Sequence, residues 1–209
     1  PDVRFENVSF HYESKREIFH NVSFNIPAGT TTAVVGQSGA GKSTLARLLF
    51  RFYDVQSGKI MIDGQNIADV TQLSLRKAIG IVPQDTVLFN DTIGYNIAYG
   101  DPSASFEEVE QATKAAQIDG FIKHLPDSYQ TQVGERGLKL SGGEKQRLAI
   151  ARMLLKSPSI VILDEATAHL DSENEALDYV ESIIDDAVCN DKELQDYIIE
   201  KKAVMHELD

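Results

Sequence analysis

Several common features are scarce in this chain of 209 residues, and each scarcity excludes a class of protein. Cys189 is the only cysteine, so no disulfide can form within the chain, and a cytosolic setting is the default expectation. No apolar run approaches the roughly 20 residues that a membrane-spanning helix needs. The 20 basic residues are outnumbered by 32 acidic ones, and the net charge of −12 argues against a protein that binds duplex nucleic acid.

No secretory signal is visible, and the chain begins with Pro1 instead of Met. We therefore expect it to be a processed protein or a piece of a longer one. The acidity is uneven, because residues 172–209 hold 12 acidic and 3 basic residues, a net charge of −9. The composition changes at about residue 172, which marks a possible boundary in the chain.

The hydrophobic pattern predicts a layered α/β fold in which strands alternate with helices. The first two predicted strands are half-polar and indicate an added antiparallel sheet, whereas the apolar run at 160–163 is typical of a parallel strand covered on both faces. The predicted strands cover 3–10, 22–26, 31–35, 59–62, 79–82 and 160–163, and the predicted helices cover 42–49, 106–125 and a segment that begins after Ser141.

The segment Gly36-Gln37-Ser38-Gly39-Ala40-Gly41-Lys42-Ser43 fits the pattern G-x-x-x-x-G-K-[ST] of a phosphate-binding loop. It follows a predicted strand and opens a predicted helix, which is the context that the motif requires. Glycines let the backbone wrap around an anion, and the helix N-terminus contributes partial positive charge. Lys42 adds a full charge, Ser43 offers a hydroxyl to Mg²⁺, and Thr44 can support a phosphate oxygen. The alternative is an ordinary glycine-rich turn.

A second helix start lies at Leu140-Ser141-Gly142-Gly143-Glu144-Lys145-Gln146-Arg147. Ser141 and Glu144 have the spacing of a capping box, and a glycine-containing helix start with free N–H groups can bind an anion. The alternative is a well-capped surface helix with no ligand.

Three further positions carry candidate chemistry. Asp164 and Glu165 follow a buried strand, where one carboxylate can hold Mg²⁺ through water and the next can deprotonate an attacking water. Gln84 ends another apolar strand and can coordinate Mg²⁺ or place a water. Tyr12 follows the first strand, where a lone aromatic residue is more often a packing residue than a base-stacking one.

Together these segments resemble the nucleotide-binding domain of an ABC transporter. Residues 140–147 match the family's signature motif, 36–44 its Walker A motif and 160–165 its Walker B motif. Gln84 corresponds to the Q-loop glutamine and Tyr12 to the A-loop aromatic residue.

The resemblance extends to about residue 175 and includes a D-loop at 168–171. The string Gly134-Glu135-Arg136-Gly137 resembles the X-loop of exporters. The segments 82–89 and 92–100 are most similar to half-size exporters of the heavy-metal, iron–sulfur and glutathione-conjugate group.

The resemblance implies a P-loop NTPase fold of the ABC type: an α/β, RecA-like core with an N-terminal antiparallel β subdomain and an inserted helical subdomain. The domain would cover 1–171, with the helical subdomain at about 86–150. Residues 172–209 would form an acidic helical tail, atypical for the family, and the core would be incomplete at its C-terminus if that tail replaces its last strands.

The resemblance also implies a mechanism in which two such domains pair head to tail with two ATP molecules between them. Tyr12 would stack on adenine beside Ile18, Glu165 would be the catalytic base, and Ser141 would face the γ-phosphate bound by the other subunit. The implied ATP-binding residues are Tyr12, Ile18, Ser38, Gly39, Ala40, Gly41, Lys42, Ser43, Thr44, Ser141, Gly142 and Gly143; the implied Mg²⁺ ligands are Ser43, Gln84 and Asp164; the implied catalytic residues are Glu165 and Gln84.

The implied partners are ATP or ADP, a second copy of the domain and the transmembrane domain of an exporter, with no nucleic acid. The coupling helices of that membrane domain would contact the helical segment between Gln84 and Ser141. The domain would then lie at the cytosolic or matrix face of a membrane.

The chain departs from the family after the D-loop. There the family has a helix and then a strand that leads to a switch histidine. Here the pattern predicts one helix at about 176–187 and a second from Leu194 that can include Met205, with no β-branched strand before a histidine. We therefore assign the switch role neither to His206 nor to His169 in the D-loop.

Two explanations of this departure remain open: a truncated or rearranged product, or a natural variant with its own helical closure. Strands missing from the central sheet would leave an unpaired edge.

The main functional hypothesis is an exporter ATPase domain whose hydrolysis is slowed by the missing switch histidine. The alternative is a module that binds nucleotide and assembles without useful turnover. A soluble ABC ATPase that acts on DNA or ribosomes is disfavoured by the acidic charge.

Overall fold

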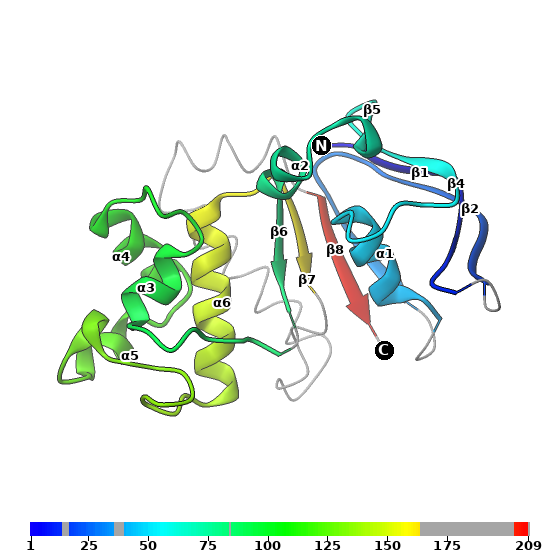
Figure 1. The fold of residues 1–209 in the computed structure, drawn as a ribbon. Coiled ribbons are helices and arrows are strands. Elements are labelled where there is room, and N and C mark those ends of the chain that lie inside the picture. Colours follow the sequence, from blue (N-terminus) through cyan, green and yellow to red (C-terminus); the bar gives the residue numbers. More distant parts are fainter. Residues whose placement is uncertain (14–16, 36–39, 84, 164–202, 209) are drawn as a thin grey trace. The chain divides into compact units, whose positions relative to one another are not determined.

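The computed structural model describes residues 1–13, 17–35, 40–83, 85–163 and 203–208. The chain divides into two compact units (Figure 1). The first contains residues 1–80, 159–165 and 197–209, and the second contains 81–158 and 166–196. Among the described residues, no helix combines the length and the apolar character needed to cross a bilayer.

An antiparallel sheet forms the N-terminal part of the first unit, as predicted. Its strands are β1 (Val3–His11), β2 (Glu17–Ile26), β4 (Ser57–Ile62) and β5 (Gln65–Asn66), in the order β2-β1-β4-β5. β2 begins earlier than predicted. Val3 pairs with Ile26 and Phe5 with Phe24, and the register then shifts at Asn7, which has a φ of 52°. This bulge moves the buried positions of β1 from Val3 and Phe5 to Val8 and Phe10, so the strand stays buried past the irregularity.

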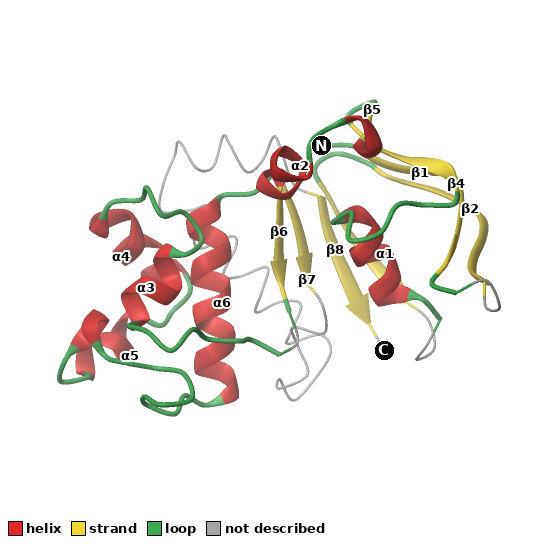
Figure 2. Ribbon diagram, in the orientation of Figure 1, coloured by secondary structure: helices red, strands yellow, loops and turns green. Residues whose placement is uncertain are grey.

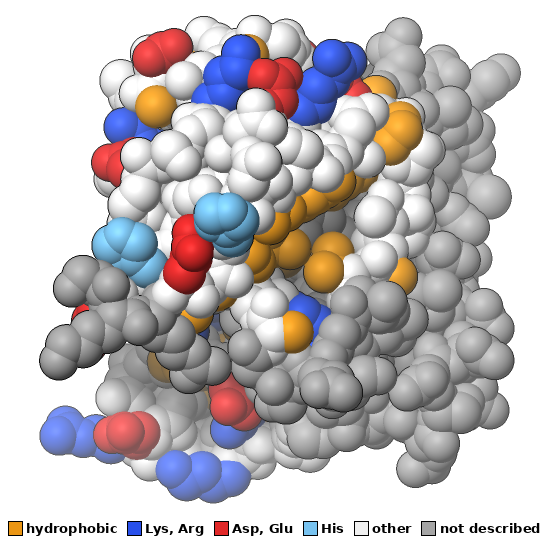
Figure 3. All heavy atoms as spheres, turned by 90° about the vertical axis from the view of Figure 1, so that its right-hand side faces the viewer, with side chains coloured by type: hydrophobic (Ala, Val, Ile, Leu, Met, Phe, Trp, Pro, Cys, Tyr) orange, Lys and Arg blue, Asp and Glu red, His pale blue; other side chains and the backbone are white. Residues whose placement is uncertain are grey.

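The exposed side of this sheet carries a mixture of polar and apolar side chains. Figure 3 views the side of the molecule where β1 and β2 lie, and hydrophobic side chains gather there beside histidine and acidic side chains. His20 pairs with Glu17 on β2, with 3.0 Å between Nδ1 and Oε1. Charged side chains on an edge strand discourage pairing with another chain.

A second sheet contains the strands that lead to the predicted phosphate loop and acidic pair. It has the order β3-β8-β7-β6, formed by β3 (Thr30–Val35), β8 (Ala203–Leu208), β7 (Ile160–Leu163) and β6 (Ile79–Val82). β8 runs parallel to both β3 and β7. The predicted strands at 31–35, 79–82 and 160–163 are confirmed.

β8 corrects the prediction for the end of the chain. We expected a helical pattern that can include Met205, and no strand leading to a histidine. Instead Ala203–Leu208 is a strand, and His206 lies in register with Ala33 on β3 and Leu163 on β7. The short apolar run is ambiguous by periodicity, and the free backbone groups of β3 and β7 decide it, because a strand between them satisfies both edges. Missing strands would have left β3 and β7 with unpaired edges here, whereas β8 pairs with both of them.

Short helices complete the first unit (Figure 2). They are α1 (Lys42–Leu49), the 3-10 helix η1 (Ile67–Asp69) and α2 (Gln72–Ala78). α1 agrees with the prediction, whereas α2 was missed because its seven residues are too few for a clear period.

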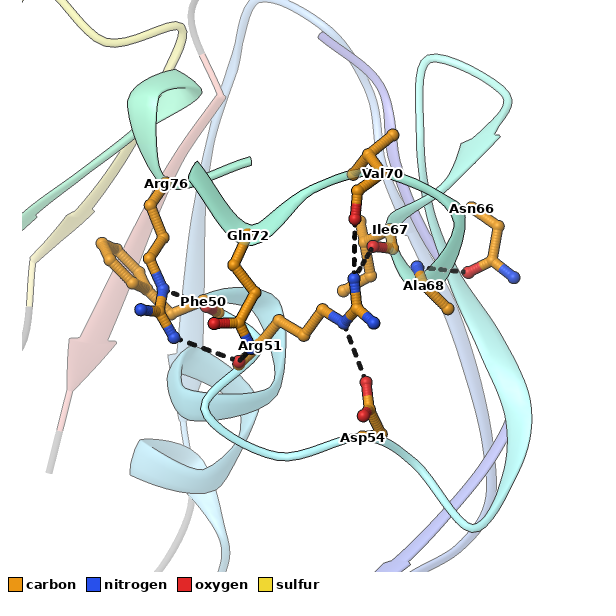
Figure 4. A network of polar contacts seen from close by, with 9 residues as sticks. All are labelled: Phe50, Arg51, Asp54, Asn66, Ile67, Ala68, Val70, Gln72 and Arg76. Atoms are coloured by element: carbon orange, nitrogen blue, oxygen red, sulfur yellow. Dashed lines mark hydrogen bonds and ion pairs between the residues drawn. The ribbon is translucent and has the colours of Figure 1, made fainter. Parts of the chain in front are cut away.

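The C-terminal end of α1 is fixed by Arg51 (Figure 4). Its guanidinium donates through Nη1 to the carbonyl oxygens of Ile67 and Val70, at 3.0 and 2.8 Å, and through Nε to Asp54 Oδ1 at 2.8 Å. One side chain thus joins the residues after α1 to the segment before α2.

Arg76 on α2 also joins α2 to the residues that follow α1. It donates to the carbonyl oxygens of Phe50 and Arg51, both at 3.3 Å, and its guanidinium lies 5.0 Å from the centre of the Phe52 ring. Basic groups at a helix C-terminus satisfy its last carbonyls and interact favourably with its dipole. Arg51 and Arg76 therefore fix the C-terminal end of α1.

The second unit is helical. Its elements are α3 (Ile93–Ala98), α4 (Phe106–Ala115), α5 (Asp119–His124), the 3-10 helix η2 (Ser128–Gln130) and α6 (Gly142–Lys156). α3 and α4 pack against α6, the longest of the described helices (Figure 1). α6 buries Leu148, Ala149, Ile150, Ala151 and Met153.

The prediction of one helix over 106–125 is wrong, because the chain turns after α4. Gln117 adopts a left-handed φ of 53°, and α5 starts two residues later at Asp119. The apolar period continues through the turn since Ala116 and Ile118 are both buried, so the pattern did not reveal the break.

We predict that Tyr129 makes the second unit lose stability as the pH rises above 10. Its buried hydroxyl lies 2.7 Å from Thr113 Oγ1 and donates to Asp119 Oδ1 at 3.1 Å, and burial raises the pKa of Tyr129 to about 12. An unfolded tyrosine has a pKa of about 10, so this contribution is complete below pH 10 and is lost as the pH rises through 12.

Tyr129→Phe should lower the free energy of unfolding by about 1 kcal/mol at pH 7 and flatten its decline above pH 10. Urea unfolding at pH 7, 10 and 11.5 measures both effects. Equal alkaline slopes for the two proteins would contradict the prediction.

Candidate functional site

The start of α1 requires a glycine at position 41. Gly41 is the residue that precedes the helix, and its φ of 99° lies in the left-handed region. A Cβ at this position would lie 2.9 Å from both Ile18 Cγ2 and Phe19 Cε1 on β2. Another residue would be strained and would also clash, so Gly41 lets the backbone enter the helix while β2 packs closely against it.

The first turn of α1 is suited to bind an anion. It contains no acidic residue, Lys42 contributes a positive charge, and Ser43 is exposed. The Gly41 carbonyl accepts from the N–H groups of Thr44 and Leu45 at 2.9 and 3.1 Å, so the helical hydrogen bonds begin at this residue. The N–H groups and the dipole of a helix N-terminus attract phosphate.

Tyr12 lies against this helix. Its hydroxyl oxygen is 3.1 Å from Oγ1 of the buried Thr44, and its side chain is 40% exposed. A partly exposed ring fixed beside a phosphate-binding helix start can offer a face to a planar base. The first unit therefore brings together Tyr12, Ile18, Gly41 and Thr44, all of which the sequence singled out.

The remaining predicted residues of this site keep their status as predictions. Ser38, Gly39, Gln84, Asp164 and Glu165 lie outside the described residues, as do His169 and the rest of the D-loop. Within the described part of the chain, no three His, Cys, Asp or Glu side chains group closely enough to hold a metal ion.

The second helix start has the predicted capping box. Ser141 N donates to Glu144 Oε2 at 2.7 Å, and Glu144 N donates to Ser141 Oγ at 3.3 Å. Ser141, Gly142 and Gly143 are all exposed, and a Cβ on Gly143 would meet no atom within 4 Å. The start of α6 thus presents an open backbone surface in the second unit.

Two contacts fix the chain around this helix start. Lys139 Nζ donates to the Glu135 carbonyl at 2.8 Å, and Arg147 Nη1 donates to the Gln117 carbonyl at 2.8 Å. The first joins the string 134–137 to the residues before α6, and the second joins α6 to the turn between α4 and α5.

The comparisons with known proteins agree with this geometry. The model of the ABC transporter family matches residues 19–168. The chain belongs to this family. The P-loop NTPase fold of the ABC type, which the sequence led us to expect, is confirmed.

The similar proteins are exporters of the expected group. An ATM1-type heavy metal exporter of Novosphingobium aromaticivorans is 65% identical over 84% of this chain, and a mitochondrial iron–sulfur clusters transporter of Aspergillus fumigatus is 60% identical over 83%. A solved structure of a bacterial Atm1-family ABC exporter with ATP bound matches 100% of the chain, with a TM-score of 0.86 and 55% identity. The chain covers only 29%, 24% and 34% of these three proteins.

The structure of this ABC domain also contains an aromatic patch that we did not predict. Phe89, Tyr95 and Tyr99 are 40%, 48% and 53% exposed, and the rings of Phe89 and Tyr99 have centroids 4.6 Å apart. Tyr95 and Tyr99 are four residues apart at α3 and so project from the same side of the helix. This spacing was the available signal in the sequence.

Buried polar groups hold the patch in place. The Asn96 side chain accepts from Phe89 N at 2.9 Å and donates to the carbonyl oxygens of Phe89 and Thr92. Arg152 of α6 donates to the Asn96 carbonyl at 2.8 Å and lies 5.8 Å from the Phe89 ring centre. Burial lowers the pKa of Arg152, but arginine remains charged at ordinary pH. The patch is therefore a fixed surface.

We predict that the capping oxygen of residue 141 stabilises α6 whether it belongs to a hydroxyl or to a carboxylate. Ser141→Ala removes the cap and should lower the free energy of unfolding by about 1 kcal/mol. Ser141→Asp retains a capping oxygen and should unfold as the unchanged protein does, although its charge would repel phosphate. Urea unfolding of the three proteins measures this. Equal losses in both variants would show that the hydroxyl contributes more than the cap.

Proposed function

We propose that the chain is the ATP-binding and ATP-hydrolysing domain of an exporter and that it works as a head-to-tail homodimer. The observation that carries this proposal is the presence of two anion-binding helix starts in one chain. The start of α1 has Gly41 and Lys42, and the start of α6 has Ser141, Gly142 and Gly143.

Each helix start has a distinct role in the proposed dimer. Gly41, Lys42, Ser43 and Thr44 bind the phosphates of ATP, together with Ser38, Gly39 and Ala40, and Tyr12 stacks on the adenine beside Ile18. The exposed start of α6 binds the γ-phosphate of the ATP held by the other subunit, which explains why its glycines are open to solvent.

The proposed chemistry is the attack of a water on the γ-phosphorus of ATP. The new P–O bond replaces the bond to the oxygen that bridges the β- and γ-phosphates, so ADP and inorganic phosphate are released. Ser43, Gln84 and Asp164 would hold Mg²⁺, which would neutralise charge on the phosphates. Glu165 would take the proton of the attacking water. Gln84 follows β6, and the pair Asp164 and Glu165 follows β7. These strands are neighbours in a sheet in which β7 runs parallel to β8.

The proposed transport partner is a transmembrane domain at the cytosolic or matrix face of a membrane. The aromatic patch Phe89, Tyr95 and Tyr99 is a fitting surface for it, because fixed aromatic side chains are typical anchors of an interface. Phe89 lies five residues after Gln84, so the patch is close in sequence to a proposed Mg²⁺ ligand. The names of the relatives point to heavy metals or iron–sulfur clusters as the cargo.

We further propose that hydrolysis by this chain is slow. His206 lies inside β8 and is followed by Glu207 and Leu208 of the same strand. A switch histidine in this family follows a strand, where it can approach the γ-phosphate. The alternative function is a module that binds nucleotide and dimerises without useful turnover.

Turnover and dimer formation test this function together. Phosphate release at saturating Mg-ATP should be slow, should disappear in Glu165→Gln, and should be unchanged in His206→Ala. Size-exclusion chromatography should show that Glu165→Gln dimerises with Mg-ATP, and that the double variant Glu165→Gln/Ser141→Asp remains monomeric.

Each outcome decides a different part of the proposal. Rapid turnover that is lost in His206→Ala would show that His206 acts as the switch histidine. That result would refute the proposal of slow hydrolysis. Dimerisation without any phosphate release would favour the assembly module. A mass that Mg-ATP never changes would refute the head-to-tail dimer.

If the aromatic patch is the docking surface, a negative charge on the patch should weaken binding to the transmembrane domain, and a negative charge elsewhere should not. Tyr99→Glu should reduce co-purification with the transmembrane domain of the Novosphingobium exporter at least tenfold, because a carboxylate would be desolvated in an apolar contact. Leu73→Glu alters an 83% exposed apolar residue on α2 and should have no effect. Equal recovery of both variants would place the docking surface elsewhere.

A further inference from the structure

Three aromatic side chains and one arginine meet at the site that the proposed function assigns to adenine. Tyr12 makes edge-to-face contacts with Phe10, at 4.9 Å between centroids, and with Tyr53, at 5.0 Å, both with interplanar angles of 84°. Phe10 is buried and fixes one neighbour of the ring, whereas Tyr53 is partly exposed. Edge-to-face pairs of this geometry are favourable beyond the area that they bury.

The hydroxyl of Tyr12 is held from α1. Arg47 Nη1 donates to it at 3.2 Å, and Thr44 Oγ1 lies 3.1 Å from it. Arg47 is three residues after Thr44, so both side chains project from the same side of the helix. Arginine only donates, so the phenol oxygen is an acceptor here.

We infer that Arg47 and Tyr53 are positioning residues for the base. They orient the Tyr12 ring relative to α1, so that the adenine-stacking face and the phosphate-binding helix start are set before the nucleotide arrives. This inference rests on the proposed binding of ATP. It explains why an exposed aromatic ring at the end of β1 is tied to the helix by two polar contacts as well as by its ring neighbours. Preorganisation of this kind lowers the entropic cost of binding.

We expect the variants to lose affinity only for a ligand that contains adenine. Mg-ADP and Mg-pyrophosphate share the phosphate contacts, but only ADP has adenine, and neither carries the γ-phosphate that drives the proposed dimer. Isothermal titration of the full chain should give Kd values for Mg-ADP about 5- to 10-fold weaker in Arg47→Met and in Tyr53→Leu. The Kd for Mg-pyrophosphate, measured directly or by competition, should change less than about twofold.

Matched control variants distinguish the positioning of the Tyr12 ring from a general effect of charge and from an effect on folding. Tyr53→Phe keeps the ring and should bind Mg-ADP as the unchanged protein does. Arg4→Met removes an exposed cation from β1 and should alter neither ligand. Arg47 and Tyr53 are both exposed, so their variants should remain folded, with melting temperatures lowered by only a few degrees.

The outcomes distinguish this inference from the function on which it rests. An equal loss of both ligands in Arg47→Met would mean that its guanidinium acts as a general charge, and no loss of Mg-ADP would remove any role in positioning. Either result overturns the inference and leaves nucleotide binding intact. Failure of the unchanged chain to bind both ligands would overturn the proposed function as well.

Discussion

The close packing of β2 against Gly41 is the constraint on which the first unit depends. No side chain fits between the backbone of Gly41 and the side chains of Ile18 and Phe19, so the loop after β3 must enter α1 at this point. The N-terminus of α1, with Lys42, is thereby fixed against the antiparallel sheet, and Tyr12 at the end of β1 reaches the same helix. Arg51 and Arg76 hold the other end of the helix. The start of α1, where we propose that phosphate binds, is therefore fixed at both ends of the helix.

The start of α6 uses the same physical principle with a different support. The Ser141–Glu144 capping box occupies the N–H groups of these two residues and leaves Gly142 and Gly143 exposed between them. Lys139 and Arg147 fix the flanking chain. An anion site with open surroundings suits a ligand that arrives on another molecule. The two helix starts in one chain thus fit a composite ATP site shared between copies, which is the basis of the proposed function.

The sequence predicted the strands at 31–35 and 160–163 and both helix starts because each depends on local chemistry. Glycine, lysine and serine at fixed spacing specify a phosphate loop, and Ser-x-x-Glu specifies a cap. The sequence did not predict the turn at Gln117, because an apolar period continues through it. It also missed the aromatic patch, since Phe89 and Tyr99 become neighbours only through the packing of the Asn96 side chain and Arg152.

The end of the chain shows most clearly what could not be predicted from the sequence. The sequence by itself determined the family, the start of α1 at Lys42 and the cap of α6, because these are patterns of neighbouring residues. Only the tertiary structure decided that Ala203–Leu208 is a strand, because the free hydrogen-bonding edges of β3 and β7 lie far away in sequence. Only the tertiary structure decided that Arg47 and Tyr53 surround Tyr12, because their contacts join strand, helix and loop across about 40 residues.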